Sequence, residues 1–356
     1  MRRLAIAAAL LALTGCNLQE LTSTSEVIRA RVAGIRAEPS EIGVGESTTL
    51  SALLVHPPGD RPDMGAVWFA CLEASNARGC LGLDFEGLVG GDDDDSADPG
   101  LDPAAFQFGV GETFVYTAQG ADLDEAWAAL SPEDRVEGLS VLVSVTYVDR
   151  SDALLQETLF ALGVAQQEGD DDALRELGDE LQGLVEGGIP AARRIIVSDK
   201  SLGTPAPLEC AADVLAPNAN PELLGATLHF EPEGRDSGFH LGPVTFVDPG
   251  TSLVLRPRVP PGTAEEYLYI TTDLETECRR ETPWYAWLSN AGGLDRDYTF
   301  TADEEDLDEV AGRPKVNHLT LPPAEEFPEV LTLWLVVRDR RGGLDWEELK
   351  FAALDE

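Results

Sequence analysis

From Val27 almost to the C-terminus, the apolar residues of this chain come in short stretches of strand length separated by turn residues. Within 139–148, Val141, Val143 and Val145 alternate with Leu142, Ser144 and Thr146, as in a β-strand. Short strands at this spacing are typical of a β-sandwich, so the sequence predicts a mainly β fold. The expected strands are 32–37, 48–55, 66–72, 112–117, 139–148 and 193–198, then 225–230, 244–247, 252–259, 267–271, 284–288, 298–301, 318–321, 330–338 and 344–351.

Both halves of the chain carry loose motifs of one domain type. The first has a Pro-x-x-x-x-x-Gly entry at Pro39–Gly45, a tryptophan in a central strand at Trp68 and a late tyrosine at Tyr147. The second has Trp287 and ends in an alternating strand followed by Asp and Gly-Gly, over Leu333–Gly343. The first set resembles bacterial immunoglobulin-like domains, and the second resembles the ending of immunoglobulin-like and polycystic-kidney-disease-type domains. This resemblance implies two immunoglobulin-like β-sandwich domains and carries no functional residues with it.

Residues 152–187 change from strand spacing to helix spacing. Asp170 to Asp172 introduce the second of two apolar stripes, and Gly187-Gly188 end it. We expect a helical insertion near the end of the first domain, with its apolar side chains packed on the sandwich. The first stripe is Leu154, Leu155, Thr158, Leu159 and Leu162, and the second is Leu174, Leu177, Leu181, Leu184 and Val185.

The N-terminus has the pattern of an export signal. Arg2 and Arg3 precede the apolar run Leu4–Leu13, which is too short for a helix that crosses a bilayer. Leu13-Thr14-Gly15-Cys16 resembles the lipobox of bacterial lipoproteins. The resemblance implies cleavage before Cys16, lipidation of its thiol, and, because Asn17 rather than aspartate follows, the outer membrane of a Gram-negative cell. An ordinary signal peptide whose Cys16 later joins a disulfide is the alternative.

These observations predict five segments. Residues 1–15 are the signal peptide, and 16–26 form a polar tether. The first domain covers 27–200 and includes an acidic loop at 90–103 and the helical insertion at 152–187. A proline-rich linker at 201–221 leads to the second domain, 222–356.

The cysteine count is consistent with a lipid on Cys16. Five cysteines are present, and setting Cys16 aside leaves an even number, as expected in an oxidising compartment. Three pairings of Cys71, Cys80, Cys210 and Cys278 are possible. We prefer Cys71 with Cys80 and Cys210 with Cys278, because each bridge then stays within one expected domain.

Charge limits the partners of the chain. Its formal net charge is −40, so nucleic acid and anionic head groups are poor partners, since both require basic patches. A hydrophobic fraction of 43% is enough for folded cores. The expected partners are the membrane, through the N-terminal lipid, and a protein or glycan ligand.

Catalytic signals are sparse. The chain has four histidines, and it has no Walker loop, Rossmann fingerprint, G-x-S-x-G or H-E-x-x-H motif. We therefore expect a non-catalytic, lipid-anchored envelope protein that acts as a structural, adhesive or ligand-binding module. The alternatives are a carboxylate-based glycan-processing hydrolase and a periplasmic carrier or assembly subunit with an exposed apolar patch on 152–187.

No cofactor is expected. Two acidic segments offer hard oxygens that calcium prefers, but neither has the spacing of an EF-hand, so solvated acidic loops are the preferred interpretation. The weak calcium candidates are Asp92, Asp93, Asp94, Asp95 and Asp98, and the other acidic segment is 303–308. The two histidines of 229–240 form a still weaker candidate for zinc or copper.

Overall fold

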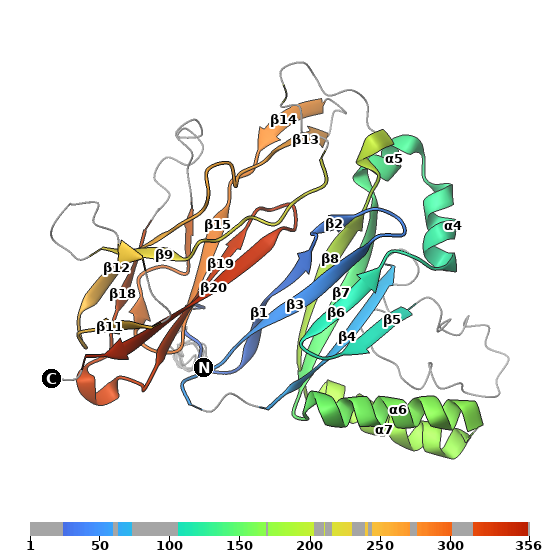
Figure 1. Ribbon diagram of the computed structural model, residues 1–356, viewed down its shortest axis with the longest axis horizontal. Helices are drawn as coiled ribbons and strands as arrows, with labels where there is room; N and C mark the ends of the chain where they lie inside the picture. Colours follow the sequence, from blue (N-terminus) through green and yellow to red (C-terminus); the bar gives the residue numbers. More distant parts are fainter. Residues whose placement is uncertain are drawn as a thin grey trace, which may run out of the picture.

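The computed structural model describes residues 24–59, 63–72, 106–168, 170–202, 210, 216–229, 239–240, 244–270, 276–300 and 316–354. The described chain is mainly β, as predicted (Figure 1). No helix in these residues is both long and apolar enough to cross a membrane. Residues 24–202 are called the first half below, and residues 216–354 the second half.

Two sheets of the first half enclose a hydrophobic core. Trp68 is fully buried in this core, and its indole Nε1 donates to the carbonyl of Gly111 at 2.8 Å. The smaller sheet has the order β1 (Arg31–Glu38), β3 (Ser47–Val55), β6 (Thr113–Thr117). The larger has the order β2 (Glu41–Ile42), β8 (Ile189–Val197), β7 (Leu139–Val148), β4 (Gly65–Leu72), β5 (Phe106–Val110). The core includes side chains from both sheets.

The second half repeats this arrangement with two five-stranded sheets around a second core. Trp287 is 1% exposed, and its Nε1 donates to Thr299 Oγ1 at 2.8 Å. One sheet has the order β10 (Phe239–His240), β9 (Ala226–His229), β12 (Ser252–Pro257), β18 (Asn317–Thr320), β16 (Gly293–Leu294). The other has the order β11 (Thr245–Val247), β20 (Leu344–Ala353), β19 (Leu331–Arg338), β15 (Trp284–Ser289), β17 (Tyr298–Phe300). A separate hairpin joins β13 (Glu266–Ile270) and β14 (Thr276–Arg280).

Helices lie at the edges of the first half. Two form the hairpin predicted from helical spacing, α6 (Asp152–Glu168) and α7 (Asp171–Glu186), and α7 begins where the Asp170 carboxylate accepts from the amide of Ala173 at 3.0 Å. Leu155 and Leu181 are fully buried with Val67 of β4 and Val148 of β7, so this hairpin packs on the larger sheet. The other helical elements of the described residues are α4 (Ala121–Ala129), α5 (Pro132–Glu137) and the 3₁₀ turn η2 (Lys200–Leu202) in the first half, and the 3₁₀ turn η4 (Ala324–Glu326) in the second.

Apart from the two-residue strands β2, β10 and β16 and the two 3₁₀ turns, four described elements were not expected from the sequence: β5, β14, α4 and α5. The strands β5 and β14 are edge partners of β4 and β13. The five residues of β5 do alternate, with Phe106, Phe108 and Val110 apolar, whereas the sequence of β14 has no such pattern. Leu123 of α4 is buried, and Ala126 and Trp127 pack against the same core at helical spacing, so this helix does carry a short apolar stripe. The start of α5 does carry a local signal, because Ser131 caps the amide of Asp134 at 3.1 Å and Pro132 follows the cap.

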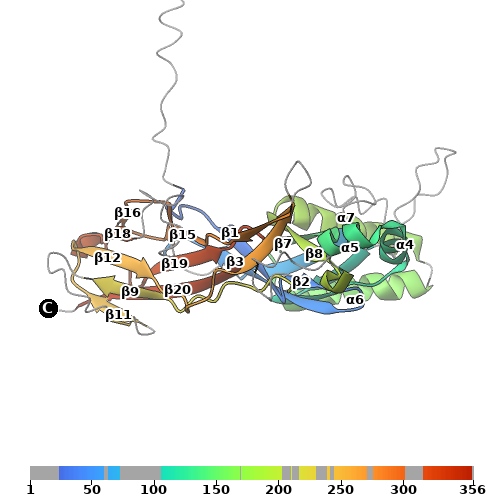
Figure 2. The ribbon, with the colours of Figure 1, turned by 90° about the horizontal axis from the view of Figure 1, so that it is seen from above.

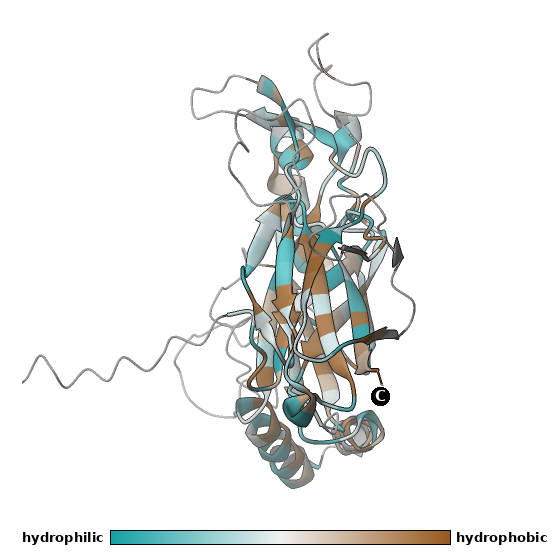
Figure 3. Cartoon of the chain, turned by 90° about the vertical axis from the view of Figure 1, so that its left-hand side faces the viewer, coloured by the Kyte–Doolittle hydropathy of each residue, from teal (hydrophilic) through white to brown (hydrophobic). Residues whose placement is uncertain are grey.

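The two halves share a further hydrophobic cluster, called the junction cluster below. Along β19, alternate residues such as Leu333 and Leu335 face the core of the second half, whereas Trp334 and Val336 face the first half. Figure 2 shows the halves arranged end to end along the molecule, with this contact between them. In Figure 3 the hydrophobic residues concentrate on the central strands. The buried members of the junction cluster are Val27, Leu53, Val55, Leu288, Trp334, Val336 and Leu344.

Candidate functional site

Polar groups of both halves are buried together beside the junction cluster. Glu41 accepts hydrogen bonds from Ser198 Oγ at 2.6 Å and from the amide of Asn218 at 2.7 Å, and it pairs with Lys200 Nζ at 2.8 Å. Burial raises the pKa of Glu41, but the hydrogen bonds from Lys200, Ser198 and Asn218 outweigh it and lower the pKa below its ordinary value. Asn218 also donates to Asp339 at 2.9 Å. This part of the expected linker is therefore bound to both halves.

A second buried carboxylate, Glu281, lies near Asp339 in the second half. Its side chain is 1% exposed and pairs with Arg341 Nη1 at 3.1 Å, and it accepts from the amide of Glu265 at 3.1 Å. Burial, followed by the negative charge of Asp339, raises the pKa of Glu281 to about 7. Arg341 also pairs with Glu265 at 3.2 Å, so it neutralises the group only in part.

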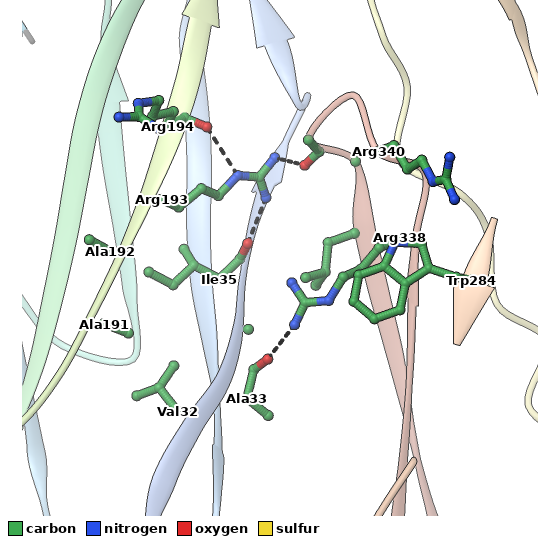
Figure 4. Close-up of a pocket in the computed structure, with 14 residues that line it drawn as sticks. Val32, Ala33, Ile35, Ala191, Ala192, Arg193, Arg194, Trp284, Arg338 and Arg340 are labelled. Atoms are coloured by element: carbon green, nitrogen blue, oxygen red, sulfur yellow. Dashed lines mark hydrogen bonds between the residues drawn. The ribbon is translucent and has the colours of Figure 1, made fainter. Parts of the chain in front are cut away.

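Between the two halves lies a cavity of about 490 Å³, called the arginine cavity below (Figure 4). It is bounded by β1 and β8 of the first half and by β15 and the β19–β20 hairpin of the second. Four of its lining residues are arginines, and none of the lining residues in the described part of the chain is acidic. The lining residues are Val32, Ala33, Gly34, Ile35, Ala191, Ala192, Arg193, Arg194, Trp284, Arg338, Arg340, Gly342, Gly343 and Leu344.

Arg193 connects three segments around this cavity. Its Nη1 donates to the carbonyl of Ile35 at 2.6 Å, its Nη2 donates to the carbonyl of Gly342, and its Nε donates to the carbonyl of Arg194 at 3.4 Å. These acceptors are uncharged backbone groups. Burial lowers the pKa of Arg193 to about 10, with the charge of Asp339 raising it and that of Arg338 lowering it further.

Arg338 reaches into the cavity from the opposite side. Its Nη2 donates to the carbonyl of Ala33 at 2.6 Å, and its guanidinium carbon lies 5.3 Å from the ring centre of Trp284. In Figure 4 the guanidinium groups of Arg193 and Arg338 both lie between β1 and the β19–β20 hairpin, whereas Arg194 and Arg340 extend to opposite sides. Arg193 and Arg338 therefore join the two halves by hydrogen bonds and place positive charge in the cavity.

The turn between β19 and β20 forms part of the lining of the arginine cavity. Asp339 accepts from the amides of Arg341 at 2.7 Å and Gly343 at 2.8 Å, which folds the turn back on itself. A Cβ on Gly343 would lie 2.8 Å from the carbonyl oxygen of Ala219, so the close approach requires glycine. Arg340 has a φ of 76°, a left-handed conformation that is uncommon for a residue with a side chain.

The structure tests some of the site residues expected from the sequence. Cys210 and Cys278 form the expected disulfide. Cys71 is also disulfide-bonded, and its expected partner Cys80 lies outside the described residues. The lipidation candidate Cys16 and the calcium candidates Asp92, Asp93, Asp94, Asp95 and Asp98 lie outside the described residues as well.

One group of potential metal ligands comes together among the described residues, namely Cys210, Glu266 and Cys278. Because the two sulfur atoms are joined in a disulfide, neither is a thiolate that could bind a metal. His229 and His240 lie on the paired strands β9 and β10, where His240 is opposite Thr227 rather than His229.

The arginine cavity was not expected from the sequence. Its four arginines come from two short segments, 193–194 and 338–340, that are far apart in the chain. The available signal was compositional, because a chain with 25 basic and 65 acidic residues has few basic side chains. Arg193 and Arg194 nevertheless lie within the apolar strand β8, and Arg338 ends the apolar strand β19.

No protein-family model matches this chain, and no curated protein matches it. Three N-terminal domains of the highly immunogenic outer capsid protein (Hoc) of bacteriophage RB49 are 10% identical, with 91% of this chain and 59% of that chain covered and a TM-score of 0.17. The adhesin InvE of Yersinia pseudotuberculosis is 11% identical, with 90% and 60% covered and a TM-score of 0.16. Dimeric latent PorU from Porphyromonas gingivalis is 10% identical, with 92% and 24% covered and a TM-score of 0.20. The chain spans less than two thirds of each, and similarities with such low TM-scores define neither its fold nor its function.

Proposed function

We propose that this chain is a non-catalytic, lipid-anchored protein of the cell envelope, held at the outer membrane, whose two immunoglobulin-like sandwiches act together as a structural, adhesive or ligand-binding module. The observation that carries the proposal is the contact between the halves. Paired domains usually move relative to each other unless their interface is extensive and apolar. Here a buried apolar cluster is combined with hydrogen bonds of Asn218, Arg193 and Arg338 between the halves, which favours one rigid body.

The start of the described chain supports the same proposal. Thr24 Oγ1 donates to Asp297 of the second half at 2.6 Å, and the amide of Val27 donates to the carbonyl of Ser289 at 2.9 Å. A chain extends by at most about 3.5 Å per residue, so Thr24 would stand no more than about 30 Å from an acylated Cys16. A lipid anchor would thus keep the rigid body close to the membrane.

The buried carboxylates favour a structural role over a catalytic one. Glu281 has a raised pKa of about 7, a property that general acids share. However, its side chain is 1% exposed and paired with Arg341, so the described residues leave no path for a glycan to reach it. This geometry supports the non-catalytic module over a carboxylate-based hydrolase.

Metabolic labelling with palmitate tests the anchor. We expect the wild type to be labelled and found in the membrane fraction, and Cys16→Ala to lose both properties because the acylated thiol is absent. Ser23→Ala, which changes the tether outside the lipobox, is the matched control and should be labelled like the wild type. Equal labelling of Cys16→Ala and the wild type would refute the anchor.

A further inference from the structure

The arginine cavity collects positive charge in a strongly acidic protein. The chain has a net charge of −40, yet the cavity is lined by Arg193, Arg194, Arg338 and Arg340 and by no acidic residue in the described part of the chain. The charge of Asp339 acts on Arg193, whereas the hydrogen bond of Arg338 goes to the backbone carbonyl of Ala33, which supplies no negative charge. An anion in the cavity would therefore be attracted chiefly by Arg338 and Arg340.

Arg338 has hydrogen-bonding capacity that its own contacts leave unused. A guanidinium has five N–H donors. Arg338 uses one of them on Ala33 at 2.6 Å, and its buried Nε has no hydrogen-bond partner among the described residues. This Nε is closed to the cavity, but Arg338 lines the cavity and its terminal nitrogen atoms carry N–H groups beyond the one bonded to Ala33. These groups can donate to an oxygen acceptor in the cavity. Trp284, beside Arg338, supplies a flat apolar surface.

Arg340 adds a second unsatisfied cation at the edge. Its side chain is exposed and makes no hydrogen bond or ion pair with the described residues. Its backbone is in the left-handed region, with a φ of 76°. Such conformations are unfavourable for a residue other than glycine and are concentrated at functional sites. The turn thus holds a cation beside the cavity in a conformation that glycine would adopt more easily.

From these observations we infer that the arginine cavity binds a small organic anion the size of a sugar acid or sugar phosphate. Its oxygens accept hydrogen bonds from Arg338 and Arg340, and its body lies against Trp284. A volume of about 490 Å³ falls within the range of small-molecule sites, about 300 to 1,000 Å³. Guanidinium groups suit carboxylate and phosphate oxygens because their donors match the spacing of these acceptors. The inference rests on the proposed function only in naming a ligand for the module, and it does not depend on the anchor.

Calorimetric titration of the full-length protein in detergent tests this inference. The probes are glucuronate, glucose 6-phosphate, inorganic phosphate and, as the neutral control, glucose. We expect both charged sugars to bind more tightly than inorganic phosphate and glucose not to bind. Binding should weaken as salt is raised from 50 mM to 500 mM, because salt screens the attraction.

Three variants locate the site. Arg340→Gln changes an exposed side chain and should keep the fold, while the loss of one charge-assisted contact should weaken binding about 10-fold or more. Arg338→Gln should have at least as large an effect, with its melting temperature measured alongside. Arg279→Gln, on the exposed surface of β14, is the matched control and should bind like the wild type.

Two results would overturn the inference. One is that neither charged sugar binds the wild type at low salt. The other is that Arg340→Gln and Arg279→Gln, both folded, bind the charged sugars equally well. Because the titration is done in solution, failure here would leave the palmitate labelling of Cys16 unaffected.

Discussion

At the scale of single residues, the junction places two buried carboxylates in opposite environments. Glu41 receives a cation and two further donors, so its pKa is lowered despite its burial. Glu281 shares its single cation with Glu265 and lies near Asp339, so burial dominates and its pKa rises to about 7. Both residues are buried glutamates, so the difference in their hydrogen-bond donors and neighbouring charges decides whether the pKa falls or rises.

Glu281 should make the stability of the protein depend on pH. Its pKa in the folded protein, about 7, is above the ordinary carboxyl value of 4.5. Its stabilising contribution is therefore complete below pH 4.5 and is lost as the pH rises through 7. Glu281→Gln stays neutral throughout, so between pH 4 and pH 8 the variant should gain up to about 3 kcal/mol in unfolding free energy relative to the wild type.

Urea unfolding at a series of pH values measures this difference. Glu277→Gln changes an exposed carboxylate on β14 and is the matched control, whose unfolding free energy should follow the wild type at every pH. The assignment fails if the difference between Glu281→Gln and the wild type is the same at pH 4 and pH 8.

At the scale of elements, the α6–α7 hairpin packs on the sheet through most of its two predicted stripes, with Leu159, Leu162, Leu184 and Val185 around two fully buried leucines. Leu155 and Leu181 are fully buried, whereas Leu154 of the predicted stripe is 50% exposed. Helical spacing identified the hairpin, but a stripe wider than the contact could not show which leucine faces the sheet. Leu181 packs with Val67 and Val148, so the hairpin depends on β4 and β7.

Leu181→Ala should destabilise the protein by about 2 to 5 kcal/mol, because it leaves a cavity between α7 and the sheet. Phe160→Ala on α6 removes a larger side chain that is 76% exposed, and it should change the unfolding free energy by no more than about 0.5 kcal/mol. Chemical denaturation of the wild type and both variants measures these changes in the free energy of unfolding. Equal effects would show that the hairpin does not pack as described.

At the scale of the whole molecule, β19 belongs to two hydrophobic regions at once. One of its faces contributes to the core of the second half, and the other, with Trp334 and Val336, contributes to the junction cluster. Trp334 is 1% exposed, and its Nε1 donates to Glu348 at 3.0 Å. The two halves should therefore unfold together.

Differential scanning calorimetry should show a single transition for the wild type. Trp334→Ala removes the largest side chain of the junction cluster, and we expect a loss of about 3 to 5 kcal/mol together with separation into two transitions. Phe246→Ala, at a side chain that is 63% exposed on β11, should keep the single transition. Two transitions in the wild type would contradict a rigid junction.

The Cys210–Cys278 disulfide was preferred among three possible pairings and is confirmed by the structure, whereas the sequence by itself determined the β class, most of the strands and the helical hairpin. These features depend on local spacing, since strands have a period of two, helices a period of 3.6, and turns favour glycine and proline. The alternation in β19 correctly placed Leu331, Leu333 and Leu335 on one face. The short elements β5 and α4 were missed although each has a local pattern, because a pattern of only a few residues does not distinguish a strand or a helix from a loop.

Only the tertiary structure decided the contact between the halves and the arginine cavity. Arg193, Ile35 and Gly342 meet there although they are far apart in the chain, and no local pattern encodes which surfaces of two folded halves come together. The apolar residues Trp334 and Val336 could have been read as a second buried face, but the sequence did not say what covers it. The physical reason is that this contact depends on the complementary shape and charge of two complete surfaces, which exist only after each half has folded.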